Sequence, residues 1–130
     1  MLLEVDPTTL SGHCQRCGVP VIAAGDPADT SSLVCERCAA DGYPGVRGHA
    51  LPDYAIAFAR ATDTHLNAAA CLEGARSWDW QARVFEEAWG RDDDDAAAAR
   101  KRAQALFAAA AAFDAVAAEQ EAWNVRKTQA

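Results

Sequence analysis

Four cysteines near the start of the chain are the residues best suited to chemistry. They form two Cys-x-x-Cys pairs, Cys14 with Cys17 and Cys35 with Cys38, and seventeen residues separate the two inner cysteines. This spacing is typical of a four-cysteine zinc site, because each pair can hold one edge of the metal while the intervening chain folds back. Four thiolates complete the tetrahedral shell and leave no position for a substrate or an activated water. The sequence therefore predicts one structural zinc ion per chain, with disulfides or a redox-active dithiol as the alternatives.

The cysteine region resembles the zinc finger of the DksA/TraR-type bacterial transcription regulators. The resemblance covers residues 14–38 and is carried by Cys14-x-x-Cys17-Gly18-x-Pro20-Val21 and Leu33-x-Cys35-x-x-Cys38. In that family the finger follows a helical hairpin whose acidic tip enters a channel of RNA polymerase, whereas in this chain the finger precedes the helices. Asp92-x-x-Asp95-x-Ala97 is similar to the acidic tip motif of the family. The resemblance implies RNA polymerase as a partner, contacted by an acidic tip made of Asp92, Asp93, Asp94 and Asp95.

Residues that could support catalysis outside the paired cysteines are isolated. Cys71 lies among alanines and Leu72, a setting in which a thiol is usually buried and unreactive. His65 stands six positions earlier, which places the two side chains about 240° apart around a helix. His49 has no cysteine, serine or carboxylate at a spacing suited to a catalytic pair. We therefore predict no catalytic residues and no enzyme activity.

The overall charge limits the kinds of partner. The chain has 130 residues and a formal net charge of −7, whereas a surface that binds nucleic acid needs an excess of lysine and arginine. No run of about 18 apolar residues is present to span a membrane, and no apolar stretch of signal-peptide type precedes the cysteines. Cysteines in metal spacing also fit a reducing compartment. We expect a cytoplasmic protein whose partners are neither nucleic acids nor membranes.

Changes in composition along the chain predict its organisation. The expected parts are an N-terminal arm at 1–13, a four-cysteine zinc ribbon at 14–42, a linker at 43–52 and a helical domain at 53–130. Branched residues at 19–22 and 33–34 predict two strands that pair with each other inside the ribbon. A part below about 40 residues usually needs a metal to hold its fold. The expected fold class is mainly α with a small zinc ribbon.

The helical domain is predicted from apolar residues that recur three and four positions apart. One helix is expected from Asp53 to Gly74 and a second from Ser77 to Gly90, with a third after the acidic run at 92–95. The carboxylates of that run face the positive end of the third helix. These elements form a helical hairpin or a three-helix bundle. Their broadest apolar stripe predicts a core that contains Trp80, Phe85 and Trp89 together with Leu66 and Phe58, with a recognition surface made of the tryptophans as the alternative.

The last helix carries a second apolar pattern. Leu106, Phe113, Val116 and Trp123 form a seam of coiled-coil type, and Phe107 lies beside it. An alanine-rich helix buries too little surface to hold a fixed position by itself, so this seam needs a partner surface. We expect these five residues to bind a partner, which is another protein or a second copy of the chain.

These features favour a non-catalytic module that docks on a larger assembly through its helical part. A closed metal site and the lack of a nucleophile paired with a base support this hypothesis. One alternative is a transcription regulator that binds RNA polymerase through the acidic tip. Another is an accessory subunit of an enzyme complex. Retention on purified polymerase would favour the regulator, and a reactive Cys71 thiol would favour an enzyme.

Overall fold

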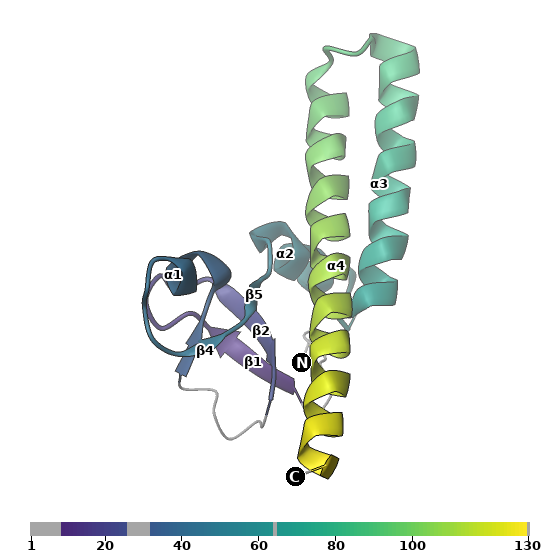
Figure 1. Ribbon diagram of the computed structural model, residues 1–130. Coiled ribbons are helices and arrows are strands. Elements are labelled where there is room, and N and C mark those ends of the chain that lie inside the picture. Colours follow the sequence, from purple (N-terminus) through teal and green to yellow (C-terminus); the bar gives the residue numbers. More distant parts are fainter. Residues whose placement is uncertain (1–8, 26–31, 64, 130) are drawn as a thin grey trace. The chain divides into compact units, whose positions relative to one another are not determined.

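The computed structural model describes residues 9–25, 32–63 and 65–129. The elements in these ranges are β1 (Thr9–His13), β2 (Pro20–Ala24), β3 (Leu33–Val34), α1 (Glu36–Ala40), β4 (Val46–Arg47), β5 (His49–Ala50), α2 (Asp53–Thr62), α3 (Ala68–Trp89) and α4 (Asp94–Gln129). Figure 1 shows the three longer helices and the short strands. The prediction of a mainly α fold with a small cysteine-containing part is confirmed.

The chain forms two compact units. The helical unit contains Pro52–Ala110, and the cysteine unit combines the described residues up to Leu51 with those from Ala111 onward. Helix α4 therefore contributes its first half to the helical unit and its second half to the cysteine unit.

Two small sheets build the cysteine unit. The first has the antiparallel order β1-β2-β5, and the second is a parallel pair of β3 with β4. The predicted pairing of 19–22 with 33–34 is wrong, because β2 lies between β1 and β5 and β3 pairs with β4. Residues assigned to the arm and the linker supply these partner strands. Their short length, with serine and glycine among them, hides the strand pattern.

Cysteines and aliphatic residues share one core in this unit. Leu10, Val21 and Leu33 are each at most 1% exposed, and Cys35 and Cys38 pack in the same cluster. Three of the four metal-ligand candidates, Cys14, Cys35 and Cys38, are therefore part of the folded interior, whereas Cys17 is exposed.

Gly48 marks a point where the backbone of this unit is closely packed. A Cβ atom there would lie 2.7 Å from the Ile22 carbonyl oxygen, which is backbone and cannot rotate away. We expect Gly48→Ala to lower the free energy of unfolding of the cysteine unit by about 1–3 kcal/mol, the usual cost of overpacking. Urea denaturation followed by NMR of the strand amides would measure this change. An unchanged or higher stability would contradict the packing described here.

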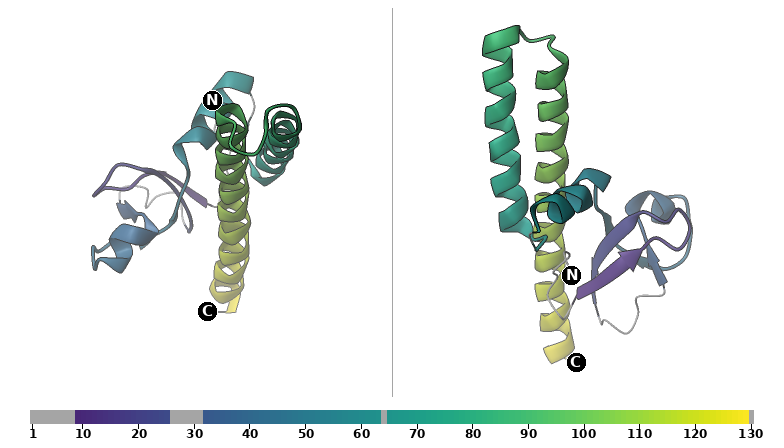
Figure 2. Two further views of the ribbon diagram at one scale, coloured as in Figure 1. Left: turned by 90° about the horizontal axis from the view of Figure 1, so that it is seen from above. Right: turned by 180° about the vertical axis from the view of Figure 1, so that it is seen from behind.

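Helices α2, α3 and the first half of α4 make up the helical unit. Helices α3 and α4 run side by side in opposite directions, joined by a short turn after Trp89 (Figures 1 and 2). Most of the buried residues on these helices are alanines, and their small side chains let helix backbones approach closely. Among the described helices, none is long enough and apolar enough to cross a membrane.

The break between the first two predicted helices falls earlier than expected. Asp63 adopts a left-handed conformation with φ 51°, and the Asn67 side chain accepts a hydrogen bond from the Ala70 amide at 2.9 Å to begin α3. Helix α3 then continues through Gly74, which is buried. A Cβ atom on Gly74 would lie 2.6 Å from Phe58 Cζ and 3.0 Å from Leu106 Cδ1. This glycine permits close helix packing, so the prediction that it ends a helix is wrong.

Two of the three tryptophans of α3 lie on the surface, and the third, Trp78, is half-buried. Trp80 is 64% exposed and Trp89 is 70% exposed, while Phe85 is half-buried. Trp80 stands nine residues after the buried Cys71, which places it about 180° around the helix from the buried face. Trp89 is the last residue of α3. The prediction that Trp80 and Trp89 pack in the core is therefore wrong.

Candidate metal centre

The first cysteine pair lies in a tight turn directly after β1. The Cys14 amide donates to the Val19 carbonyl at 2.8 Å, and the Gly18 amide donates to the Cys14 carbonyl at 2.8 Å. Gly18 has φ 80°, a left-handed conformation that glycine adopts without steric cost. The Gln15 amide donates to the Leu33 carbonyl at 3.0 Å and so links this turn to β3. These bonds turn Cys14 and Cys17 toward the same side.

The second pair is positioned by a short helix. Cys35 follows β3 and forms the N-cap of α1, where its Sγ accepts a hydrogen bond from the Cys38 amide at 3.4 Å. Cys38 lies inside α1, and its carbonyl accepts a hydrogen bond from the Tyr43 amide at 3.1 Å. The N-cap and the third residue of α1 thus present both sulfurs from one helical turn.

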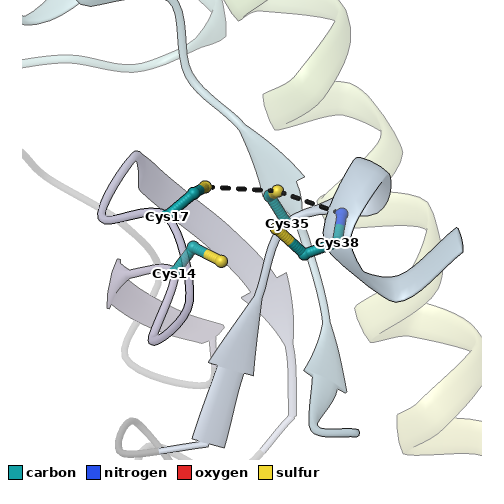
Figure 3. A group of neighbouring side chains, drawn as sticks. All are labelled: Cys14, Cys17, Cys35 and Cys38. Carbon is teal, nitrogen blue, oxygen red and sulfur yellow. Dashed lines mark hydrogen bonds between the residues drawn. The ribbon is translucent and has the colours of Figure 1, made fainter. Parts of the chain in front are cut away.

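The four sulfur atoms converge on one point between these two elements (Figure 3). All four Sγ atoms lie within 4.8 Å of one another. The Sγ atoms of Cys17 and Cys35 are 3.7 Å apart, far beyond the length of about 2 Å of a disulfide bond. All five cysteines lie in the described part of the chain, and none is in a disulfide. The four cysteines could therefore hold a metal ion.

The local environment lowers the pKa of two of the cluster thiols and raises the pKa of a third. The amide of Cys17 lowers the pKa of the Cys14 thiol to about 6. The amide of Cys38 likewise lowers the pKa of Cys35, whereas burial raises the pKa of Cys38 to about 12. Two thiols are thus predisposed to ionise, and the buried Cys38 thiol gains most from a cation that stabilises its thiolate.

Comparisons with protein-family models, curated proteins and solved structures find no match. The resemblance to the DksA/TraR-type finger therefore rests on the cysteine spacing, and membership of that family stays a hypothesis.

Arg16 connects the two cysteine turns at the surface. Its Nη1 lies 3.3 Å from Asp41 Oδ2, and its guanidinium lies 5.7 Å from the centre of the Tyr43 ring. Both members of the ion pair are exposed, so the contact contributes little stability by itself. It joins the first cysteine turn to the C-terminal end of α1.

His49 forms contacts that the sequence did not indicate. Its Nε2 lies 2.7 Å from Glu119 Oε1, and its Nδ1 lies 3.6 Å from Glu36 Oε2. The carboxylates contact opposite nitrogens of the ring, so these three side chains do not converge as ligands of one metal. Glu119 is 70 residues from His49 in the chain, and sequence spacing gives no signal for such a contact.

The five predicted partner-binding residues are not equally accessible. Leu106 is fully buried and Val116 is 4% exposed, whereas Phe107 is 41% exposed. Phe113 and Trp123 are half-buried. Leu106 and Val116 are thus covered within the chain, and Phe107 is the exposed member of the set. Binding of a partner by these residues stays a prediction.

The acidic run lies at the turn between α3 and α4, as expected. Asp93 Oδ2 accepts a hydrogen bond from the Ala96 amide at 3.1 Å and so caps the start of α4. Asp92, Asp94 and Asp95 are exposed. One carboxylate therefore has a structural role, and three face solvent.

Cys71 is unsuited to nucleophilic chemistry. It is fully buried in the helical unit, and this burial raises the pKa of its thiol to about 11. At neutral pH the side chain stays a neutral thiol and packs as a small apolar residue.

Proposed function

We propose that this protein is a non-catalytic, zinc-stabilised module that binds another protein through its helical unit. The observation that carries the proposal is the exposed pair Trp80 and Val84 on the outer face of α3. These residues are 64% and 37% exposed and stand four positions apart, so they are neighbours on one helix face. Tryptophan is enriched among the residues that dominate protein interfaces. A partner that covers this pair would remove a large ring from water.

The edge of this surface also suits an interface. Arg83 Nη2 lies 3.0 Å from Asp79 Oδ2, so an exposed ion pair borders the two apolar side chains. An apolar centre with a polar rim is the usual anatomy of a protein interface. The partner is another protein, and a second copy of the chain is the alternative that the experiment below distinguishes.

Zinc is the metal that best suits the four cysteines. Zinc–sulfur bonds of about 2.3 Å in a tetrahedron place neighbouring sulfurs about 3.8 Å apart. The 3.7 Å separation of the Cys17 and Cys35 sulfurs agrees with that value. Thiolates favour zinc over calcium or magnesium, and four of them leave no open coordination position. We therefore propose one structural zinc ion per chain and a reducing compartment such as the cytoplasm.

The role of Trp80 can be tested by separating stability from binding. Because Trp80 is exposed, we expect Trp80→Ala to change the free energy of unfolding by less than about 0.5 kcal/mol. The same change should weaken partner binding by about 2 kcal/mol or more, as at an interface hot spot. A photo-crosslinking residue at position 80, introduced in the native cell, would trap the partner for identification. Calorimetry with that partner, or sedimentation for a second copy, would then measure affinity.

Lys101→Ala is the control, since Lys101 is exposed on α4 and lies outside this face of α3. It should leave binding unchanged. If Trp80→Ala instead destabilises the protein by about 3–5 kcal/mol, the cost of emptying a buried aromatic site, Trp80 is a core residue and the proposal fails.

A second candidate function uses the tip of the hairpin. Trp89 is 70% exposed at the end of α3, and the exposed carboxylates at 92, 94 and 95 follow it. An apolar ring beside negative charge suits a basic protein surface, which fits the hypothesis of a regulator that binds RNA polymerase. Retention on purified polymerase that is lost in Asp92→Asn/Asp95→Asn, but not in Trp80→Ala, would favour this candidate over the α3 face.

A further inference from the structure

We infer that metal binding controls the docking of the second half of α4 on the cysteine unit. The inference rests on the proposed metal binding and adds a regulatory consequence to it. Its basis is a continuous set of contacts from the sulfur cluster through α1 and β5 to α4.

The first link is the helix that carries two of the sulfurs. Helix α1 has five residues, too few to be stable without a tether, and Cys35 and Cys38 are its N-cap and its third residue. Glu36 is the first residue of this helix. A metal bound by both cysteines fixes α1, and with it the position of the Glu36 carboxylate.

The second link is His49. Its ring stands between the carboxylates of Glu36, at 3.6 Å, and Glu119, at 2.7 Å. Glu119 belongs to α4, and His49 belongs to β5. The imidazole therefore joins α1 to α4 through one side chain.

The third link is a hydrogen bond to Gln120, the residue that follows Glu119 in α4. The Gly25 amide, at the end of β2, donates to Gln120 Oε1 at 2.7 Å. The Gln120 side chain also donates to Asn124 Oδ1 at 3.1 Å, and the residue is only 5% exposed. Glu119 and Gln120 thus attach α4 to β5 and to the end of β2, and Val116 is buried one turn earlier.

The metal supports the surface that receives these contacts. Cys14, Cys35 and Cys38 belong to the same buried cluster as Val21 of β2, so loss of the metal removes the centre of a very small core. The part of the unit up to Leu51 is close to the size of about 40 residues below which a fold usually needs a metal or a cross-link. When the sheet loosens, Gly25 and His49 lose their positions and α4 loses its partners. Residues 111–126 would then be released while the earlier part of α4 stays in the helical unit.

Hydrogen exchange of the full-length protein tests this coupling. The protein is compared with its metal bound and after treatment with a strong chelator, and the metal content of each sample is measured. We expect amides in 111–126 to exchange at least about tenfold faster after metal removal, as expected for loss of tertiary packing. Amides in 96–106, within the helical unit, should change less than about twofold. Unchanged exchange of 111–126 in a sample shown to lack metal would overturn the inference.

Two variants test the specific link through His49 while the metal stays bound. Glu119→Gln removes the carboxylate that His49 contacts, and Glu121→Gln is the matched control at an exposed position of the same helix. We expect Glu119→Gln to speed exchange in 111–126 by about three- to tenfold, the effect of a lost charged hydrogen bond, and the control to have no effect. Equal exchange in both variants would overturn the His49 link. A purified protein that binds no metal would refute the proposed metal centre itself. A protein that binds metal but shows no change in the exchange of 111–126 on metal removal would refute only the coupling between the metal and α4.

Discussion

Removal of the metal is expected to unfold the cysteine unit and to leave the helical unit folded. Structural zinc sites contribute apparent binding free energies of about 10–16 kcal/mol, comparable to or larger than the whole stability of a small domain. The core of the cysteine unit is built around Cys14, Cys35 and Cys38, so little remains to hold the two short sheets. NMR spectra of the chelated protein should lose the dispersed amide signals of 10–25 and 32–51 and keep those of 53–63 and 65–106.

Cys38→Ser tests the same point without a chelator. Burial raises the pKa of the Cys38 thiol to about 12, so this thiol loses its proton when it binds the metal. We expect the variant to bind the metal at least about a thousandfold more weakly, since a metal-bound thiolate is replaced by a neutral hydroxyl. Cys71→Ala is the control, because Cys71 is a cysteine outside the sulfur cluster and should leave one metal per chain. Affinity should also fall as the pH falls, because acid returns protons to the thiolates. Metal loss in both variants, or in neither, would contradict the assignment of the ligands.

Truncation of Leu106 is expected to be the most damaging single change in the helical unit. Leu106 is fully buried, and its Cδ1 occupies the space left by the missing side chain of Gly74. Leu106→Ala should lower the free energy of unfolding by about 2–5 kcal/mol, the range for a leucine removed from a packed core. Urea denaturation would measure this loss.

Phe107→Ala is the matched control for that experiment. Phe107 is the next residue and is 41% exposed, so its loss should cost less than about 1 kcal/mol. If both variants lose the same stability, the two residues are not divided into core and surface as described. If Leu106→Ala leaves stability unchanged, the seam on α4 serves a partner and not the interior.

Features that depend on neighbouring residues could be predicted from the sequence. The spacing of the cysteines predicted the sulfur cluster, because the two cysteines of each pair are close in the sequence. The seventeen residues between the pairs are enough for the chain to fold back and bring the pairs together. The end of α3 at Gly90, with φ 97°, and the cap of α4 by Asp93 are local as well.

Features that depend on distant residues could not be predicted. The partners of β2 and the contacts of His49 join segments whose sequences carry no mark of their pairing. The role of Gly74 could not be predicted for a different reason. A glycine is suited both to the end of a helix and to a position where two helices pack closely. The neighbours decide between these roles, and Phe58 and Leu106 are 16 and 32 residues away in the sequence.

The position of the tryptophans also could not be predicted from periodicity. Trp80 and Trp89 are nine residues apart, which places them on opposite sides of α3 and not on one apolar face. The buried face of α3 is made of small residues such as Ala75 and Ala82, which carry a weak hydropathy signal. The large aromatic residues dominate the apolar pattern, so the predicted core includes Trp80, which lies on the exposed side of α3.

Native mass spectrometry of the intact protein is the most direct test of the metal centre on which the cysteine unit depends. Purified under reducing conditions, the protein is expected to show the mass of one chain with one zinc ion, and the zinc should leave on treatment with a chelator. The Cys71→Ala variant should retain the zinc, and Cys38→Ser should not. A chain that carries no metal, or one whose mass indicates disulfides among Cys14, Cys17, Cys35 and Cys38, would contradict the proposed centre.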